Sequence, residues 1–310
     1  MATSRQILYG TTAMARDWES AFTQWAKPPG TTEETRCENA IKAIRNAISK
    51  SDKLKERNIK VFVQGSYRNN VNVRKDSDVD VGVVCFDSFH PTYPEGMLAK
   101  SFGHSDATYL FKTFKAELVE ALRDHFGWDA VEPGNKAIDV KENSYHVEAD
   151  VAPFFEHRRY IDQTRYHSGV MLRPDNGGII INWPEQHYDN GVEKNKDTSL
   201  RYKGGVRILK SLRIEMEAAG IAAADPIVGF LIECMVFNSP NSCFSYDTWD
   251  ERVQSFLHHL YYNTAEAERC AEWGEVSELK YLFKNQATKR EKAYAFVNAA
   301  WDYVGVRSHS

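Results

Sequence analysis

The chain lacks the features of a membrane, secreted or zinc-ribbon protein. No run of about 18 apolar residues occurs that would span a bilayer, and no apolar segment near the N-terminus is typical of a secretory signal. The five cysteines are odd in number and widely spaced, with no C-x-x-C pair, which is typical of a reducing compartment and gives no structural zinc site. We therefore expect a cytoplasmic protein with no membrane partner.

The chain also lacks a large excess of either sign of charge. The chain has 39 Lys and Arg against 43 Asp and Glu, a net charge of −4, which argues against broad nucleic-acid binding but permits a local basic pocket. Its 310 residues, 42% of them hydrophobic, are enough for a sizeable core in one two-lobed domain or two small domains. No internal repeat is present.

The pattern of apolar residues changes near residue 182. Before it, helices are expected over 14–25, from 31 to about 50 and over 107–126, short strands over 61–63, 79–86, 137–140, 145–151, 160–161, 170–172 and 179–181, and a loop over 89–103. After it, helices are expected over 199–219, 226–237, 249–262 and 288–303. The sequence thus predicts a mixed α/β lobe, residues 1–181, and a helical lobe, residues 182–310, with the N-terminal helix packed across both.

Two carboxylates, Asp78 and Asp80, stand two positions apart on a run of valines. Successive side chains of a strand point to opposite faces, so both acids lie on one face and the valines on the other. Asp76 has the same spacing, but Lys75 and Ser77 flank it and a loop is expected there. Carboxylate oxygens are the ligands that Mg²⁺ prefers. The spacing therefore predicts a magnesium site at the start of this strand.

A later strand presents two further acids, Glu148 and Asp150, on one face. If this strand lies beside the first, one of them completes a cluster of three carboxylates, which is stable only with cations bound. Two Mg²⁺ ions suit such a cluster, one activating an attacking hydroxyl and the other neutralising a triphosphate and its leaving pyrophosphate. The acid nearest the nucleophile can also take the hydroxyl proton.

Cationic residues concentrate between positions 194 and 213. Lys203, Arg207 and Lys210 recur at i, i+4 and i+7, so they share one helix face. Taken alone, this face fits the solvated surface of an amphipathic helix. Opposite an acidic metal site, it suits a triphosphate.

A small Gly65-Ser66 turn precedes the acidic strand. Ser66 also suits a helix N-cap, and the free N–H groups of a helix start bind anions. Gln64 before the turn and Arg68 after it each allow two interpretations, a structural role or a contact with the nucleotide.

In this order, the motifs resemble the DNA polymerase β-type nucleotidyltransferases, and most closely their cGAS/DncV-like branch, the CD-NTases. Gly65-Ser66, Asp78-Val-Asp80 and Asp150-Val-Ala-Pro153 match the family pattern, which selects Asp150 over Glu148. The resemblance implies an α+β fold in which a polymerase β-like palm and a C-terminal helical lobe enclose a nucleotide cleft.

The resemblance extends into the helical lobe. The segment 202–210 is similar to the family's phosphate-binding helix, and Phe230-Leu-Ile-Glu233 to an aromatic-x-x-Glu segment whose ring stacks on a base. Phe replaces the more usual Tyr, and stacking survives that change. Gly229 replaces a Ser often found there, which removes a hydroxyl contact.

The resemblance implies a monomeric enzyme that joins nucleoside triphosphates, releases pyrophosphate and makes a cyclic di- or trinucleotide second messenger. The absence of a Cys/His insertion and of a basic spine for duplex DNA points to the bacterial branch, whose members act in anti-phage signalling. The implied nucleotide-binding residues are Gln64, Gly65, Ser66, Lys203, Arg207, Lys210 and Phe230. The implied catalytic residues Asp78, Asp80 and Asp150 hold two Mg²⁺, for which Mn²⁺ can substitute.

Three other functions remain open at this point. One is linear oligonucleotide synthesis, or nucleotide addition to a protein, RNA or drug. Another is a nucleotide-binding regulator without catalysis, against which the three carboxylates argue. A structural Ca²⁺ site is the third, although the segment 76–82 does not continue as an EF-hand loop. The bases, the linkage, the ring size and any activator are not readable from the sequence.

Overall fold

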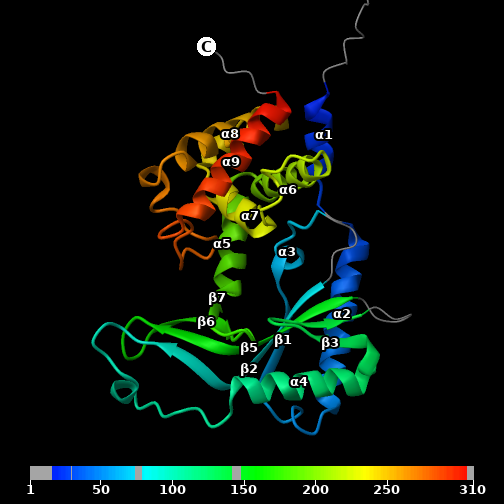
Figure 1. The fold of residues 1–310 in the computed structure, drawn as a ribbon, viewed down its shortest axis with the longest axis vertical. Coiled ribbons are helices and arrows are strands. Elements are labelled where there is room, and N and C mark those ends of the chain that lie inside the picture. Colours follow the sequence, from blue (N-terminus) through cyan, green and yellow to red (C-terminus); the bar gives the residue numbers. More distant parts are fainter. Residues whose placement is uncertain (1–15, 29, 74–78, 142–147, 306–310) are drawn as a thin grey trace, which may run out of the picture.

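The computed structural model describes residues 16–28, 30–73, 79–141 and 148–305, which form a sheet lobe and a helical lobe (Figure 1). Its helices are α1 Trp18–Trp25, α2 Thr31–Lys50, α3 Gly65–Arg68, α4 Phe111–Phe126, α5 Pro184–Asp197, α6 Tyr202–Ala218, α7 Gly229–Phe237, α8 Trp249–Thr264 and α9 Ala287–Val304. Its strands are β1 Ile59–Val63, β2 Val79–Thr92, β3 Val131–Pro133, β4 Ile138–Val140, β5 Ala149–Tyr160, β6 Tyr166–Leu172 and β7 Ile180–Asn182. No helix in these ranges is long and apolar enough to cross a bilayer.

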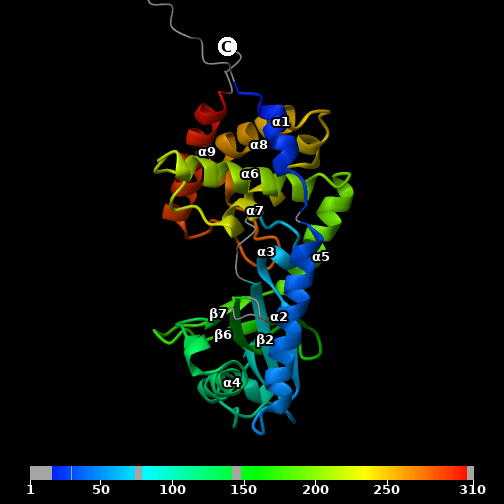
Figure 2. The same cartoon turned by 90° about the vertical axis from the view of Figure 1, so that its right-hand side faces the viewer.

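The palm is a mixed sheet in the order β1-β2-β5-β4-β3, with β6 and β7 added along the far part of β5. The central pair, β2 and β5, is parallel, and the remaining pairs are antiparallel. Val79, Val81 and Val83 are fully buried, whereas Asp80 between them is partly exposed, as the alternation predicts. Helices α2 and α4 both contribute to the core of the sheet, and α4 runs across the direction of α2 (Figures 1 and 2).

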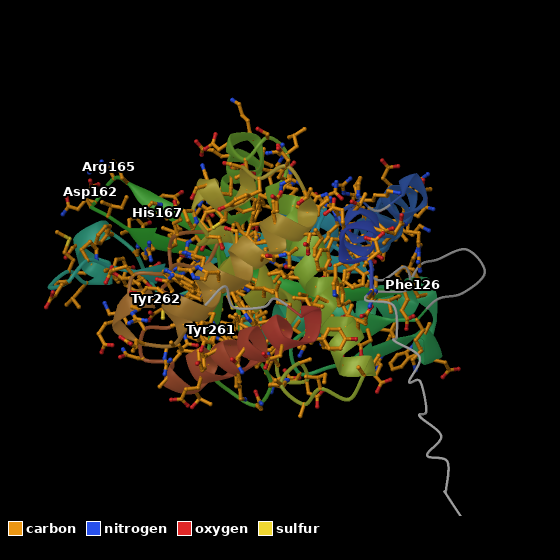
Figure 3. The ribbon with its side chains drawn as sticks, turned by 90° about the horizontal axis from the view of Figure 1, so that it is seen from above. Phe126, Asp162, Arg165, His167, Tyr261 and Tyr262 are labelled. Carbon is orange, nitrogen blue, oxygen red and sulfur yellow. The ribbon has the colours of Figure 1, made fainter. Side chains whose placement is uncertain are left out.

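Strand β2 continues further than the sequence predicts. The expected loop over 89–103 is wrong in its first part, because β2 runs to Thr92 and includes Pro91. Beyond Cys85, β2 pairs with β5 alone, after a shift of register, so one edge needs no N–H from the proline. The extended β5–β6 turn, with Asp162 and Arg165, projects to one side of the molecule, away from Phe126 at the end of α4 (Figure 3).

The helical lobe is built around α6, whose Tyr202, Val206 and Leu209 are fully buried. Phe22 of α1 belongs to this core, while α2 packs on the palm, so the two N-terminal helices serve different lobes (Figure 2). The structure thus differs from the expected 1–181 lobe at α1, and the N-terminal pair, rather than one helix, extends over both lobes.

Helix α5 connects the sheet to the helical lobe (Figure 1). The apolar pattern places the first helix of this lobe at 199–219 and does not predict α5. The sequence of α5 is mostly polar, and Gly191 is its one buried residue among those the structure describes. Pro184 starts the helix at a position where the missing N–H costs no hydrogen bond.

Candidate active site

A cavity of about 620 Å³ lies where the two lobes meet. Its walls come from α3 and β2 on the palm side and from α5, α6, α7 and the segment 275–277 on the other. The residues predicted from the sequence that line it are Gln64, Gly65, Ser66, Asp80, Lys210 and Phe230. Asp150, Lys203 and Arg207 are not among the lining residues, and Asp78 lies outside the described residues.

The parallel pairing of β2 and β5 sets Asp80 and Asp150 side by side. Their Cα atoms are register partners, and neighbouring strands lie about 4.8 Å apart, so both carboxylates leave the same face of the sheet. The alternative third acid, Glu148, is exposed just before β5, and its carbonyl accepts the Val79 N–H at 3.1 Å. On the other side of Asp150, Asp139 of β4 is its register partner and is exposed, an acid that no sequence motif indicates.

The donor set of this edge fits a hard divalent cation, because carboxylate oxygens are the ligands such ions prefer. Within the described residues no group of three or more His, Cys, Asp and Glu side chains is close enough to hold a metal ion. Asp78, the remaining member of the predicted set, lies outside those residues.

The Gly-Ser turn forms the short helix α3, directly against Asp80. Gly65 has a φ of +67°, and a β-carbon at this position would overlap the Asp80 carboxylate. The backbone N–H of Gln64 donates to the Asp80 carbonyl at 2.9 Å, which holds the turn to the strand. Ser66 lies inside α3 and Gln64 is the N-cap residue, so the N-cap interpretation of Ser66 is wrong.

A buried carboxylate, Glu233 of α7, connects the walls of the cavity. His187 of α5 contacts it through Nε2 at 2.9 Å, Asn69 donates to it through Nδ2 at 3.3 Å, and the Lys210 ammonium lies 3.7 Å away. Burial acts to raise the pKa of Glu233, but Lys210 and then His187 outweigh it, and the pKa is lowered. Burial lowers the pKa of Lys210, and Glu233 opposes that shift.

Phe230 lines the cavity and is partly exposed. Phe230 is 42% exposed, and its ring centroid lies 5.7 Å from that of His187. Gly229 beside it also lines the cavity. A β-carbon there would lie 3.2 Å from Cε of Lys210, so the small residue leaves room for the lysine stem.

Comparison with known proteins shows the family of this chain. Residues 189–305 match the model of the cGAS/DncV-like nucleotidyltransferase C-terminal helical domain. A cyclic dipyrimidine nucleotide synthase CdnE of Cecembia lonarensis is 43% identical over 271 residues, 87% of this chain and 92% of the relative. The chain belongs to the cGAS/DncV-like nucleotidyltransferases.

Two further comparisons agree with this CD-NTase assignment. A Legionella pneumophila protein, also a cyclic dipyrimidine nucleotide synthase CdnE, is 41% identical over 298 residues, 94% of this chain and 99% of the relative. The solved structure of Elizabethkingia meningoseptica CdnE cyclic dinucleotide synthase with GTP and Apcpp superposes with a TM-score of 0.77 at 35% identity, covering 93% of this chain and 98% of that one. The predicted fold class, a palm and a helical lobe, is confirmed.

In this CD-NTase, Arg207 is committed to backbone carbonyls. Its guanidinium donates from Nε and Nη2 to the carbonyl of Ala26, the C-cap of α1, and from Nη1 to the carbonyl of Asn70 at 2.6 Å. Arg207 is buried, and burial lowers its pKa to about 10. The structure therefore places Arg207 behind the cavity wall, where it holds the α3 turn, and not at a phosphate position as expected.

Two other basic residues that could bind phosphate, Lys203 and Arg68, already contact protein side chains. The Lys203 ammonium lies 5.7 Å from the centroid of the Tyr188 ring, and burial lowers the pKa of Lys203. Arg68 lines the cavity and pairs with Glu185 of α5, while its buried Nη1 makes no hydrogen bond among the described residues.

Proposed function

We propose that this chain joins two nucleoside triphosphates into a cyclic dinucleotide, with at least one pyrimidine base. In each of two steps a ribose hydroxyl oxygen forms a bond to an α-phosphorus, the bond to pyrophosphate breaks, and the hydroxyl proton leaves. The observation that carries the proposal is that one cavity is lined both by Asp80, the register partner of Asp150, and by the partly exposed ring of Phe230. The names of the two CdnE relatives support both the cyclic product and the pyrimidine.

Asp78, Asp80 and Asp150 would hold two Mg²⁺, for which Mn²⁺ can substitute. When bound, the ions would activate the attacking hydroxyl and neutralise charge on the triphosphate. Asp150, which does not line the cavity, is the proposed nucleophile-side acid and the route for the hydroxyl proton.

The other proposed contacts come from both lobes. Gly65 and Ser66 would bind the β- and γ-phosphates through backbone N–H groups and the hydroxyl, next to Gln64. Lys210 would supply the positive charge from the facing lobe, and Phe230 would stack on a base. Lys203 and Arg207, which do not line the cavity, would act on the nucleotide through the residues that do.

The biological role rests on the family resemblance. We propose a monomeric cytoplasmic enzyme, without a duplex-DNA activator, whose product is a second messenger in bacterial anti-phage defence. Gel filtration with light scattering would test the monomer. Phage challenge of bacteria that carry the chain, with and without Asp80→Asn, would test the defence role.

The decisive experiment is product identification. The purified protein, incubated with all four labelled triphosphates and Mg²⁺, should give a phosphatase-resistant product whose mass is that of a cyclic dinucleotide containing uracil or cytosine. A product that phosphatase degrades would indicate linear synthesis and overturn the cyclisation. A cyclic product with purines alone would overturn only the base assignment.

A further inference from the structure

One carboxylate, that of Glu233, contacts a residue from each of three segments that line the cavity: His187 of α5, Lys210 of α6 and Asn69 of the α3 turn. We propose that Glu233 is a positioning residue that sets the base platform, the phosphate lysine and the Gly-Ser turn relative to one another. This inference rests on the proposed function, because it names the part of the same site that aligns the nucleotide.

The first contact leads to the base. The Nε2 of His187 lies 2.9 Å from Glu233, and a carboxylate only accepts hydrogen bonds, so Nε2 carries the proton and the ring orientation is fixed. The fixed imidazole packs beside Phe230 with 32° between the ring planes. Phe230 lies in the first turn of α7 and Glu233 about one turn later, so the same helix supplies the ring and the group that holds its neighbour.

The second contact leads to the phosphates. Lys210 is 5% exposed, and an ammonium this deeply buried needs a counter-charge. Glu233 provides it at 3.7 Å while Lys210 still lines the cavity. Two other groups act on the pKa of Lys210. Arg207, also on α6, lowers it by repulsion between the two positive charges, and Cys234 on α7 raises it.

The third contact leads to the turn. Asn69 follows α3 directly, so its amide fixes the end of the segment that starts at Gly65. Arg207 binds the carbonyl of the next residue, Asn70. The turn is therefore tied to the helical lobe at two consecutive positions, which holds Gly65 and Ser66 at a set distance from Lys210.

The composition of α7 argues against a purely structural role. The helix reads Gly-Phe-Leu-Ile-Glu-Cys-Met-Val-Phe, and Glu233 is its only charged residue. Its neighbours from Leu231 to Val236 are all buried and apolar apart from Glu233. A buried ion pair is often no more stabilising than apolar residues of similar volume, so stability alone does not account for a carboxylate here.

The test compares two probes in the full chain. Non-hydrolysable analogues of the nucleoside triphosphates report on base and phosphates, and the corresponding monophosphates report mainly on the base. Glu233→Gln keeps the shape but removes the charge. We expect it to weaken binding of the triphosphate analogue at least about tenfold and of the monophosphate several-fold. Lys210→Met should weaken only the triphosphate, and His187→Leu should weaken both.

Because Glu233 acts partly through Lys210, the double variant Glu233→Gln with Lys210→Met should lose less than the product of the two single losses. Glu120→Gln is the matched control. Glu120 pairs with Lys53 on the surface of α4, far from the cavity, and its substitution should leave both affinities unchanged. Binding needs no turnover, so this test stays decisive if the chain makes a different product.

The proposal is overturned if Glu233→Gln binds both probes within about twofold of the unsubstituted chain, whatever its melting temperature. If that variant does not fold, His187→Gln and His187→Leu replace it. The Gln amide can still donate to Glu233, so binding should survive in His187→Gln and fall about tenfold in His187→Leu. Equal affinities in these two variants would also overturn the proposal.

Discussion

Gly65 lies so close to Asp80 that a β-carbon at position 65 would overlap the carboxylate oxygen and come within 3.0 Å of Cγ. The φ of Gly65, +67°, is also one that side-chain-bearing residues rarely adopt. The Gly-Ser turn and the acidic strand are thus fitted to one another, and no larger residue can occupy this position without moving the carboxylate.

Gly65→Ala should therefore lower kcat by about a hundredfold or more, since displacement of a reacting group by about 1 Å has this effect. Gly103→Ala is the matched control, because Gly103 has a φ of +68° and nothing within 4 Å of the added carbon. Both variants should lose about 1–2 kcal/mol in urea unfolding. Equal turnover in the two variants would contradict the fit between turn and carboxylate.

Asp80→Asn and Asp150→Asn should each abolish pyrophosphate release in Mg²⁺ or Mn²⁺ and leave the fold intact. Removing one of several neighbouring carboxylates relieves repulsion, so the free energy of unfolding without metal should not fall. The double variant Asp78→Asn with Asp80→Asn should also lose pyrophosphate release and keep its fold. Asp139→Asn, the same change on the next strand, should keep its turnover. Product formation by either single variant would defeat the metal assignment.

Phe230→Ala should raise KM by roughly five- to a hundredfold, because stacking a base on an aromatic ring is worth about 1–3 kcal/mol. Phe230→Tyr should stay within about threefold, since it keeps the ring face. Val228→Ala removes an exposed apolar neighbour that does not line the cavity and should change little. An unchanged KM for Phe230→Ala would place the base elsewhere.

Arg207→Lys should destabilise the chain by about 2–4 kcal/mol in urea unfolding, because a lysine cannot reach the carbonyls of both Ala26 and Asn70 with a fork of donors. Arg165→Lys, in an exposed ion pair with Asp162, should cost at most about 0.5 kcal/mol. A stable Arg207→Lys variant with a raised KM for triphosphate would instead indicate a direct phosphate contact.

Stability should fall as the solution is acidified from about pH 6.5 towards pH 4. Burial, and to a smaller extent the neighbouring His90, lower the pKa of His157 to about 4. The pKa of His90 is also lowered, first by burial and then by the positive charge of Arg173. In this interval the unfolded chain binds protons that the folded chain excludes, so acid favours unfolding by about 1–3 kcal/mol. The cationic groups Arg159 and Lys280 act on His157 in the same direction.

Urea unfolding at several pH values would measure this slope. His157→Gln, which does not titrate, should flatten it. A chain whose stability is unchanged between pH 7 and pH 4.5, or a variant with the same slope, would contradict the assignment of the acid sensitivity to this histidine pair.

Local patterns in the sequence predicted the acidic strand of the palm, although not how far it extends. Valines alternating with Asp80 predict which side chains face the core, and the structure adds the register that sets Asp150 opposite. The basic helix shows the limit of this reasoning. A spacing of i, i+4, i+7 puts Arg207 and Lys210 on one face but does not reveal that Ala26 and Asn70 cover the first of them.

Helix α5 shows a second limit. Its polar sequence has no apolar stripe to mark it as a helix, so His187 could not be placed beside Glu233 in advance. What makes α5 helical is its position as a connection between lobes, with contacts from both sides, and such contacts are set by the tertiary fold. The cavity wall that it forms was therefore readable only from the structure.

The membership of Phe22 in the helical core has a consequence for biosynthesis. This ring shares a core with residues of α6, α8 and α9, which are translated about 180 to 280 residues later. During translation the apolar side chains of α1 therefore emerge before the helices that cover them in the folded protein. A fragment limited to residues 189–305 would in turn have an unfilled socket where Phe22 and Ala26 belong.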